Sequence, residues 1–590
     1  MTDLTASSRQ SASWSTAWAT RLTGWSVGFL GMAIAVPGCS LILGGDGGFL
    51  QCQTDSDCDQ FTGDWVCDVA NNTCVEDSVA DDTATDTETG DGDGDGDPTG
   101  DGDGDGDGDG DAACTTHTEC VDLHNENWMC GCSGTCVNAL TPQCQLVKWP
   151  NDTPQDNVVF VGSIMPTSPP FDTLVLPLQN SMQLAIADFN KEAQLPGGEK
   201  IAWVACDSVA GTQAVQVAQH LVDNVCVPAI VGPVFSEAVI AVSEMVTIPA
   251  GVFTITPTGT SKKITDLVDD DLVWRPIASD IYQAEAIADR LEAIAEPGDN
   301  VVILNKNDEY GNSLSLDAYA KTMGVNVTDV FAYDLQLDPN DPIADVADHI
   351  ANTIFTDGGA NPPEVIVLVG TSEVQAFMLG YLQAISVMQP PPFPKFLVSH
   401  GAVPSMVDVI KHPLVIDEDM TQQLLYSILQ GVAPIIFDEQ NFTAFNTRYM
   451  VKFMETNSIS TSSLAYDSAL VTMFAMAAIP DGQAITGANI AAQMSKLVDP
   501  EGVFISFGPE INTTFIKTAV NALSVGGTVD LKGVSGELSF DLTTGDVRTD
   551  LIGWQPEPIN ANLDTPGLVP KRVYVLDPEP ATAGTWMELP

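Results

Sequence analysis

The sequence predicts an α/β protein with a parallel sheet flanked by helices, preceded by small disulfide-rich modules and a disordered acidic linker. Two observations carry this prediction. From about residue 155, short apolar runs alternate with segments of helical periodicity. Ahead of them, two similar cysteine clusters flank the stretch "TGDGDGDGDPTGDGDGDGDGDGDAA", residues 89 to 113. Strand and helix in alternation favour right-handed crossovers and a sheet covered on both faces.

The net charge argues against nucleic acid or anionic lipid headgroups as partners. The 590 residues carry a formal charge of −59 at pH 7, so phosphate groups would be repelled by nearly every face. The acidity extends over the whole chain and is more typical of a solubility trait than of a site.

The N-terminus has the pattern of an export signal. Arg9 and Arg21 precede an apolar run over 25–36, which is too short to span a bilayer and suits the core of a signal peptide. The following "VPGCS" resembles a bacterial lipobox, which predicts that residues 1–38 are removed and that Cys39 receives lipid. The resemblance implies anchoring in the cell envelope, and Ser40 favours the outer membrane or cell surface over the inner membrane. A secretory signal without lipid and an uncleaved anchor are the alternatives.

The remaining twelve cysteines fall into three groups of four, six and two. Even groups predict an oxidising compartment and complete disulfide pairing within separate units. The first two groups share one frame, with Trp65 and Trp128 at matching places, so we expect two copies of a disulfide module, at 39–76 and 113–150. Zinc is the alternative, but the absence of CxxC pairs disfavours it. The order of pairing stays open.

The linker between the modules spans residues 77–112. A segment of alternating Asp and Gly cannot bury enough apolar surface to offset the conformational entropy that ordering would cost. We therefore expect an extended, disordered spacer that holds the C-terminal region away from the membrane. Calcium binding is the alternative, although strict alternation lacks the fixed geometry of a calcium loop.

The globular region alternates strands with amphipathic helices. In the first predicted helix, one face carries Leu178, Met182, Ile186 and Phe189, and in the second, one face carries Ala214, Val217, Ala218 and Leu221. Predicted strands include 157–164, the runs "KIAWVAC", "VPAIVGP" and "GVFTIT", and 299–305, 363–370 and 394–399. Parallel sheets bind ligands at the carboxyl ends of their strands.

Ordered landmarks give this region a family resemblance. They are "GSIMP", "NSMQLAIADFN", "CDSVAGTQAVQVAQHLV", "AIVGPVFSEAV", "FTITPTGTS", "NDEYGNSL", "SSLAYDSALV" and "SGELSFDLTTGDV". The chain resembles the type I periplasmic binding proteins, in particular the branched-chain amino-acid (Leu/Ile/Val) substrate-binding branch of ABC transporters. The resemblance implies a domain over 151–590 with two α/β lobes joined by three crossovers. The lobes are expected at about 155–277 with 421–528 and at about 280–420 with 529–560.

The same resemblance implies functional residues. Cys206 and Cys226 would form a disulfide, with two free thiols as the alternative. Ser236, the backbone of Thr258 and the hydroxyl of Thr260 would bind a ligand carboxylate, and Tyr310 would line the site from the second lobe. From the residues alone, Ser236 could instead cap a helix, and Tyr310 could pack at the hinge.

The second lobe departs from the amino-acid pattern. Where the family has an acidic residue for the ligand ammonium, this chain has His400, and Ser372 lies where an aromatic pair is expected. Glu373 could supply the carboxylate from a shifted position. His400 could instead bind a different polar ligand or face solvent.

The leading hypothesis is a lipid-anchored solute-binding protein that captures a small polar or amino-acid-like ligand for ABC-type transport or sensing. Its partners would be a small carboxylate or amino acid, a permease or envelope protein, and the membrane through the lipid. The alternative is an interaction lipoprotein of the same fold that docks on envelope proteins. No motif predicts an enzyme, a cofactor or a metal site.

Overall fold

The computed structural model describes residues 65–68, 73–76 and, with gaps, 113–589. The gaps are 170, 210, 315, 317–319, 321–323, 335–349, 351–360, 389–390, 417–418, 435–438, 455–460, 509–510, 561–564 and 578–583. The chain divides into two units, residues 1–83 and 84–590. The signal segment, Cys39 and the linker lie outside the described residues.

Both cysteine-rich segments contain the same small antiparallel hairpin. In the first unit, β1 (Trp65–Asp68) pairs with β2 (Thr73–Glu76), with Cys67 opposite Cys74. In the second unit, β3 (Trp128–Cys130) pairs with β4 (Cys136–Asn138), with Cys130 opposite Cys136. The two hairpins place corresponding residues of the shared frame in the same register.

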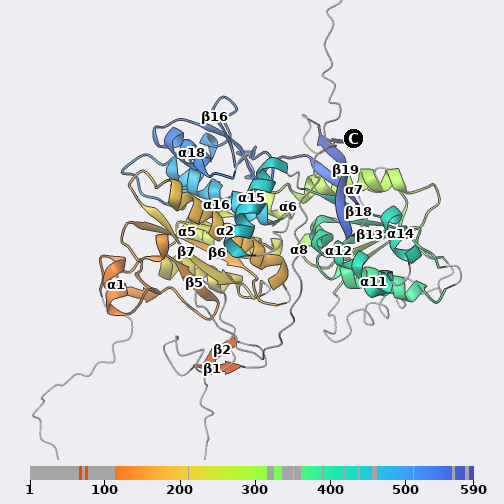
Figure 1. Cartoon of the computed structure of the whole chain (residues 1–590), viewed down its shortest axis with the longest axis horizontal. Helices are drawn as coiled ribbons and strands as arrows, with labels where there is room; N and C mark the ends of the chain where they lie inside the picture. Colours follow the sequence, from red (N-terminus) through yellow and green to blue (C-terminus); the bar gives the residue numbers. More distant parts are fainter. Residues whose placement is uncertain are drawn as a thin grey trace, which may run out of the picture. The chain divides into compact units, whose positions relative to one another are not determined.

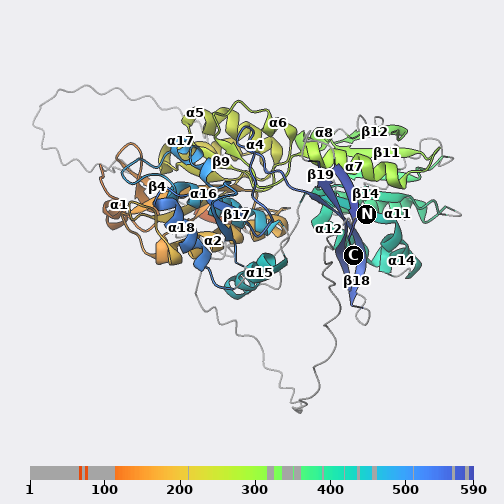
Figure 2. The ribbon, with the colours of Figure 1, turned by 90° about the horizontal axis from the view of Figure 1, so that it is seen from above.

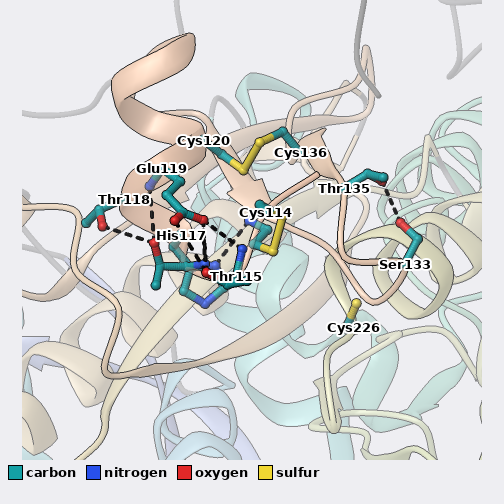
Figure 3. Close-up of a disulfide and its surroundings, with 12 residues drawn as sticks. Cys114, Thr115, His117, Thr118, Glu119, Cys120, Ser133, Thr135, Cys136 and Cys226 are labelled. Carbon is teal, nitrogen blue, oxygen red and sulfur yellow. Dashed lines mark hydrogen bonds between the residues drawn. A yellow bond between two sulfur atoms is a disulfide. The ribbon is translucent and has the colours of Figure 1, made fainter. Parts of the chain in front are cut away.

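The second hairpin packs against a short helix, α1 (His117–Leu123). Disulfides join Cys114 to Cys130 and Cys120 to Cys136, and Figure 3 shows the Cys120–Cys136 bond beside the helix. Thr116 begins the helix with a capping box, in which Glu119 accepts from the backbone of Thr116.

The predicted Cys206–Cys226 disulfide is wrong. Cys206 bonds to Cys144, and Cys226 bonds to Cys132. The cause lies in the sheet, because β5 (Cys144–Lys148) pairs antiparallel with β7 (Lys200–Asp207) and sets Cys144 opposite Cys206. Pairing within separate units is therefore also wrong, because two bridges fasten the second cysteine-rich segment to the globular region. The expected boundary at residue 150, between the second disulfide module and the globular domain, is wrong for the same reason.

The first lobe is built on a six-stranded sheet of order β10-β9-β8-β6-β7-β5. Strands β5, β6 and β7 of this sheet are labelled in Figure 1. Every pair is parallel except the edge pair of β5 and β7. Its other strands are β6 (Val158–Met165), β8 (Ala229–Val231), β9 (Phe253–Ile255) and β10 (Val273–Trp274).

Helices cover this sheet on both faces. One core gathers the long helices α2 and α16 with β16, β17 and α18, and another gathers the helices that follow β7 and β8 with Met129 and Trp149 of the cysteine-rich segment. The elements are α2 (Asp172–Glu192), α3 (Ala214–His220), η3 (Leu221–Val225), α4 (Ser236–Val242), η4 (Ser243–Thr247), α5 (Ile248–Ala250), α6 (Lys262–Thr265), α15 (Glu439–Phe453), α16 (Ser462–Ala477), α17 (Gly487–Ala491), β16 (Val503–Ser506), α18 (Thr514–Ser524) and β17 (Val529–Lys532).

The second lobe has an eight-stranded sheet of order β12-β11-β13-β14-β15-β18-β19-β20. The first five strands are parallel, and the last three form an antiparallel ribbon whose long hairpin of β18 and β19 is seen in Figure 2. The elements are α7 (Asp280–Ile294), β11 (Val301–Lys306), α8 (Glu309–Ser313), β12 (Val327–Tyr333), β13 (Val365–Val369), α11 (Val374–Ile385), β14 (Lys395–Val398), α12 (Val403–Lys411), α13 (Pro413–Ile416), α14 (Asp419–Ile428), β15 (Leu429–Ala433), β18 (Leu551–Asn560), β19 (Thr565–Leu576) and β20 (Gly584–Glu588).

The structure corrects the expected lobe boundaries. Strand β15 belongs to the second sheet, so the return to the first lobe comes after Ala433 rather than at 421. Residues 529–547 belong to the first lobe, because Leu531 and Val547 lie in its core. The second lobe extends past 560, since β20 reaches Glu588.

The helical faces that the sequence predicted are confirmed. Leu178, Met182, Ile186 and Phe189 are buried in the first lobe, as are Ala214, Val217, Ala218 and Leu221. Among the described residues, no helix combines the length and apolar character needed to cross a bilayer.

Candidate functional site

The loops that follow β8 and β9 meet at Ser236. Its buried hydroxyl oxygen accepts hydrogen bonds from the backbone N–H groups of Thr260 and Ser261, each at 3.1 Å. The helix-cap alternative is wrong, because Phe235 occupies the N-cap of α4 and no side chain caps the helix. Ser236 therefore holds two loops together and keeps its own hydroxyl hydrogen available.

The loop after β9 is held from several sides. The hydroxyl of Thr258 donates to the carbonyl of Val234 at 2.7 Å, which ties the two loops a second time. A Cβ at Gly259 would lie 2.9 Å from Thr256 Oγ1, so the close approach requires glycine there.

Helix α8 of the second lobe also contacts this loop. Ser261 donates its hydroxyl to Glu309 at 3.0 Å, and the N–H of Lys262 donates to Ser313 Oγ at 2.9 Å. These bonds place the start of α8, which carries Tyr310, against the loop of the first lobe.

A buried carboxyl group, Asp280, adjoins the same loop. It begins α7, and its N–H donates to the carbonyl of Thr260 at 2.8 Å. Its Oδ1 accepts from Gln283 at 3.1 Å, whereas Oδ2 makes no hydrogen bond of normal geometry among the described residues, although the hydroxyls of Thr260 and Ser313 lie near the carboxyl group. Burial raises the pKa of Asp280 to about 7, although the hydroxyl of Thr260 and the charge of Arg275 act in the opposite direction.

Tyr310 and His400 lie together in the second lobe. The Tyr310 hydroxyl donates to Ser399 Oγ at 2.9 Å, accepts from the N–H of Gly401 at 3.1 Å and lies 3.2 Å from His400 Nδ1. Tyr310 is thus fixed by a polar network at the carboxyl ends of β11 and β14, and its side chain also belongs to an apolar core of the second lobe.

His400 is joined to Asp280 through Gln283. The His400 backbone N–H donates to Gln283 Oε1 at 3.1 Å, and His400 Nδ1 lies 2.9 Å from the same oxygen. An amide oxygen only accepts, so the network assigns the proton to Nδ1. Burial lowers the pKa of His400 to about 3. The imidazole is therefore neutral near pH 7, with Nε2 as an acceptor.

The remaining two predicted positions have different surroundings. Ser372 is half-buried in the loop after β13, and its carbonyl accepts from the N–H of Gln375 at 3.2 Å. Glu373 accepts from Tyr333 at 2.9 Å and from the hydroxyl of Thr371 at 2.6 Å. Its carboxylate is committed within the second lobe, which makes it a poor partner for a ligand ammonium.

Sequence reasoning missed Asp280, Gln283 and Ser261. A signal was present for the first, because "ASD" places an N-cap serine before an acidic residue at the start of a helix, directly after a crossover. The pattern gave no sign that this carboxyl would be buried beside the loop of the first lobe.

The two lobes thus bring hydroxyl, amide and carboxyl groups together where the loops of the first lobe meet helices α7 and α8 of the second. Residues 158–385 match the family model described as periplasmic binding protein. No curated protein sequence matches the chain.

Solved structures show the same architecture at low identity. The leucine binding protein LivK of Thermotoga maritima is 17% identical with a TM-score of 0.51, over 70% of this chain and 98% of that one. The branched-chain amino acid transporter substrate binding protein LivJ of Streptococcus pneumoniae, in complex with isoleucine, is 17% identical with a TM-score of 0.49, over 70% and 99%. A solute binding protein of an ABC transporter from Rhodopseudomonas palustris, in complex with 3,4-dihydroxybenzoic acid, is 16% identical with a TM-score of 0.48, over 73% and 98%.

Over residues 158–385 the chain is similar to the periplasmic binding protein family, and its two lobes have the type I fold of periplasmic binding proteins.

Proposed function

We propose that the protein captures a small amino-acid-like ligand between its lobes, outside the cytoplasm, for ABC-type transport or sensing. The ligand carboxylate would bind at Ser236 and Thr260, and the ligand ammonium would bind at Asp280. The observation that carries the proposal is the pairing of a hydroxyl- and amide-rich loop with a buried carboxyl group, one oxygen of which makes no hydrogen bond of normal geometry among the described residues.

The charges favour a zwitterion over a simple anion. The carboxylate of a simple anion would be repelled by an ionised Asp280. The ammonium of a zwitterion, placed between the ligand carboxylate and Asp280, would instead neutralise a buried charge. The similarity to a protein named leucine binding protein supports an amino-acid ligand, whereas the 3,4-dihydroxybenzoic acid complex shows that a protein of similar fold binds a carboxylate without an ammonium.

A thermal-shift panel on the full chain tests this proposal. L-leucine should raise the melting temperature, whereas 4-methylpentanoate, which lacks the ammonium, and isoamylamine, which lacks the carboxylate, should raise it far less at equal concentration. Equal shifts with all three compounds, or no shift with any of the twenty common amino acids at millimolar concentration, would contradict the proposal.

The lipid anchor is part of the proposal. Cys39 would tie the protein to the outer membrane or cell surface, with the acidic linker as a spacer. Intact mass measurement of the purified mature protein checks this, because diacylation at Cys39 adds a lipid mass that a Cys39→Ala variant lacks.

A second candidate, docking on envelope proteins without solute, is favoured by one observation. Two disulfides fasten the second cysteine-rich segment to the first lobe, an addition that ligand capture does not require. A negative amino-acid panel, together with a ligand-free purified protein, would favour this candidate.

A further inference from the structure

Arg275 is a fully buried arginine whose side chain hydrogen-bonds to four residues. Its side chain is 0% exposed, and its Nε donates to Asp546 Oδ1 at 2.6 Å. Its Nη1 donates to the carbonyl of Ser261 at 2.8 Å and to that of Gly259 at 3.2 Å, and its Nη2 donates to the hydroxyl of Thr265.

These contacts fix the orientation of two peptide groups in the loop that follows β9, which is called the ligand loop here. In the peptide that joins Gly259 to Thr260, the carbonyl accepts from Arg275 and the N–H points at Ser236. In the peptide that joins Ser261 to Lys262, the carbonyl accepts from Arg275 and the N–H points at Ser313 of the second lobe. One guanidinium therefore sets the orientation of two peptide planes whose N–H ends face opposite lobes.

The same side chain joins two of the crossovers between the lobes. Arg275 lies on the first crossover, between β10 and α7, and Asp546 lies just before the third, between β17 and β18. The backbones run side by side there, because Arg275 N–H donates to Gly545 at 3.0 Å and Val547 N–H donates to Arg275 at 3.1 Å. Asp546 Oδ2 also accepts from Thr265 at 2.8 Å.

We infer that Arg275 is a positioning residue, which fixes the orientation of the peptides that carry the N–H groups of Thr260 and Lys262 and couples that orientation to the crossovers through Asp546. The identity of the ligand rests on the proposed function, but the positioning itself does not. Lysine cannot replace it, because one ammonium lacks the planar fork that reaches two carbonyls and a carboxylate together.

Amide hydrogen exchange on the unliganded full chain tests this inference. We expect Arg275→Lys, Arg275→Met and Asp546→Asn each to speed exchange of the Thr260 and Lys262 amides about tenfold, while amides of strand β7 keep their protection. The matched control is Arg448→Lys, which alters another largely buried Arg–Asp pair of the first lobe, 3.4 Å from Asp188, that does not touch the loop.

The outcomes separate positioning from general support of the fold. Faster exchange confined to the loop in the Arg275 and Asp546 variants supports the inference, and failure of lysine to restore protection shows that the fork, not the charge, is required. Unchanged loop exchange in folded Arg275→Lys and Asp546→Asn, or an equal change in Arg448→Lys, overturns it. Because no ligand is used, a negative amino-acid panel would contradict only the proposed function.

Discussion

At the scale of single residues, the site contains a buried acid, Asp280, and a buried neutral base, His400. Burial raises the pKa of Asp280 to about 7 and lowers that of His400 to about 3. The acid that the family pattern places at His400 is absent, and Asp280 offers a carboxyl group from the start of α7 instead. The two groups are connected through the side chain of Gln283.

Binding of an amino acid should release protons near neutral pH. An ammonium beside Asp280 favours the charged carboxylate and lowers its pKa, so about half a proton should leave at pH 7 and almost none at pH 9. Titration calorimetry of L-leucine in phosphate and in Tris measures the release. Asp280→Asn should abolish it, whereas Asp467→Asn should not, because Asp467 is a buried acid that instead binds Ser535. Equal heats in both buffers at pH 7 would contradict this assignment.

Removing the hydroxyl of Ser236 should weaken ligand binding. The Ser236→Ala variant leaves two backbone N–H groups without their acceptor and removes a donor to the ligand, which costs about 1–3 kcal/mol, or roughly fivefold to 150-fold in affinity. Calorimetry with L-leucine measures the change. Thr472→Val, which removes a buried hydroxyl from α16, is the control. An unchanged dissociation constant in folded Ser236→Ala would exclude Ser236 from the site.

His400 should make the fold sensitive to acid. Its folded pKa lies below the unfolded value of 6.5, so the unfolded chain binds more protons between about pH 3 and 6.5. The stability from neutral His400 is complete above pH 6.5 and is lost as the pH falls toward 3. Asp280 acts in the opposite sense, because its raised pKa favours the folded state as the pH falls.

Comparison of His400→Gln with the wild type isolates the contribution of His400 to the pH dependence of stability. We expect His400→Gln to lose less stability than the wild type between pH 7 and pH 4.5, measured as the change in urea unfolding midpoint. A loss as large as that of the wild type would show that His400 does not titrate in this way.

At the scale of elements, the strands and helices of the lobes could be predicted, but the cysteine pairing could not. The sequence located β6 and β7 because each is a short, nearly continuous apolar run, and α2 because its apolar residues recur at helical spacing. Even cysteine counts are satisfied equally by pairing within or between segments. Cys144 lies opposite Cys206 only because β5 pairs antiparallel with β7. A local sequence pattern does not predict a strand pairing between cysteines 62 residues apart.

The two bridges between the cysteine-rich segment and the first lobe should contribute to stability. Replacing both Cys144 and Cys206 by alanine should lower the free energy of unfolding by about 2–5 kcal/mol, because long loops of the unfolded chain are released. Urea unfolding of the oxidised protein measures this loss, and peptide mapping should recover Cys144 linked to Cys206. Recovery of Cys206 linked to Cys226 would contradict the structure.

At the scale of the whole molecule, the two-lobed fold followed from ordered landmarks, whereas its boundaries did not. Strand β15 and residues 529–547 were assigned to the wrong lobe, because each adjoins a crossover and its lobe depends on which sheet or core receives it. The candidate site was predicted in part for a similar reason. Ser236 and Thr260 lie on strand-end loops with recognisable sequence, but burial of Asp280 depends on α7 and α8 packing against the first lobe.

Native mass spectrometry of the purified full chain tests the capture of a zwitterion between the lobes most directly. With L-leucine or the best amino acid of the panel added, the wild type should gain the mass of one ligand molecule, and Ser236→Ala and Asp280→Asn should show a much smaller bound fraction. A spectrum of polypeptide alone at millimolar amino acid, or equal bound fractions in all three proteins, would contradict the account.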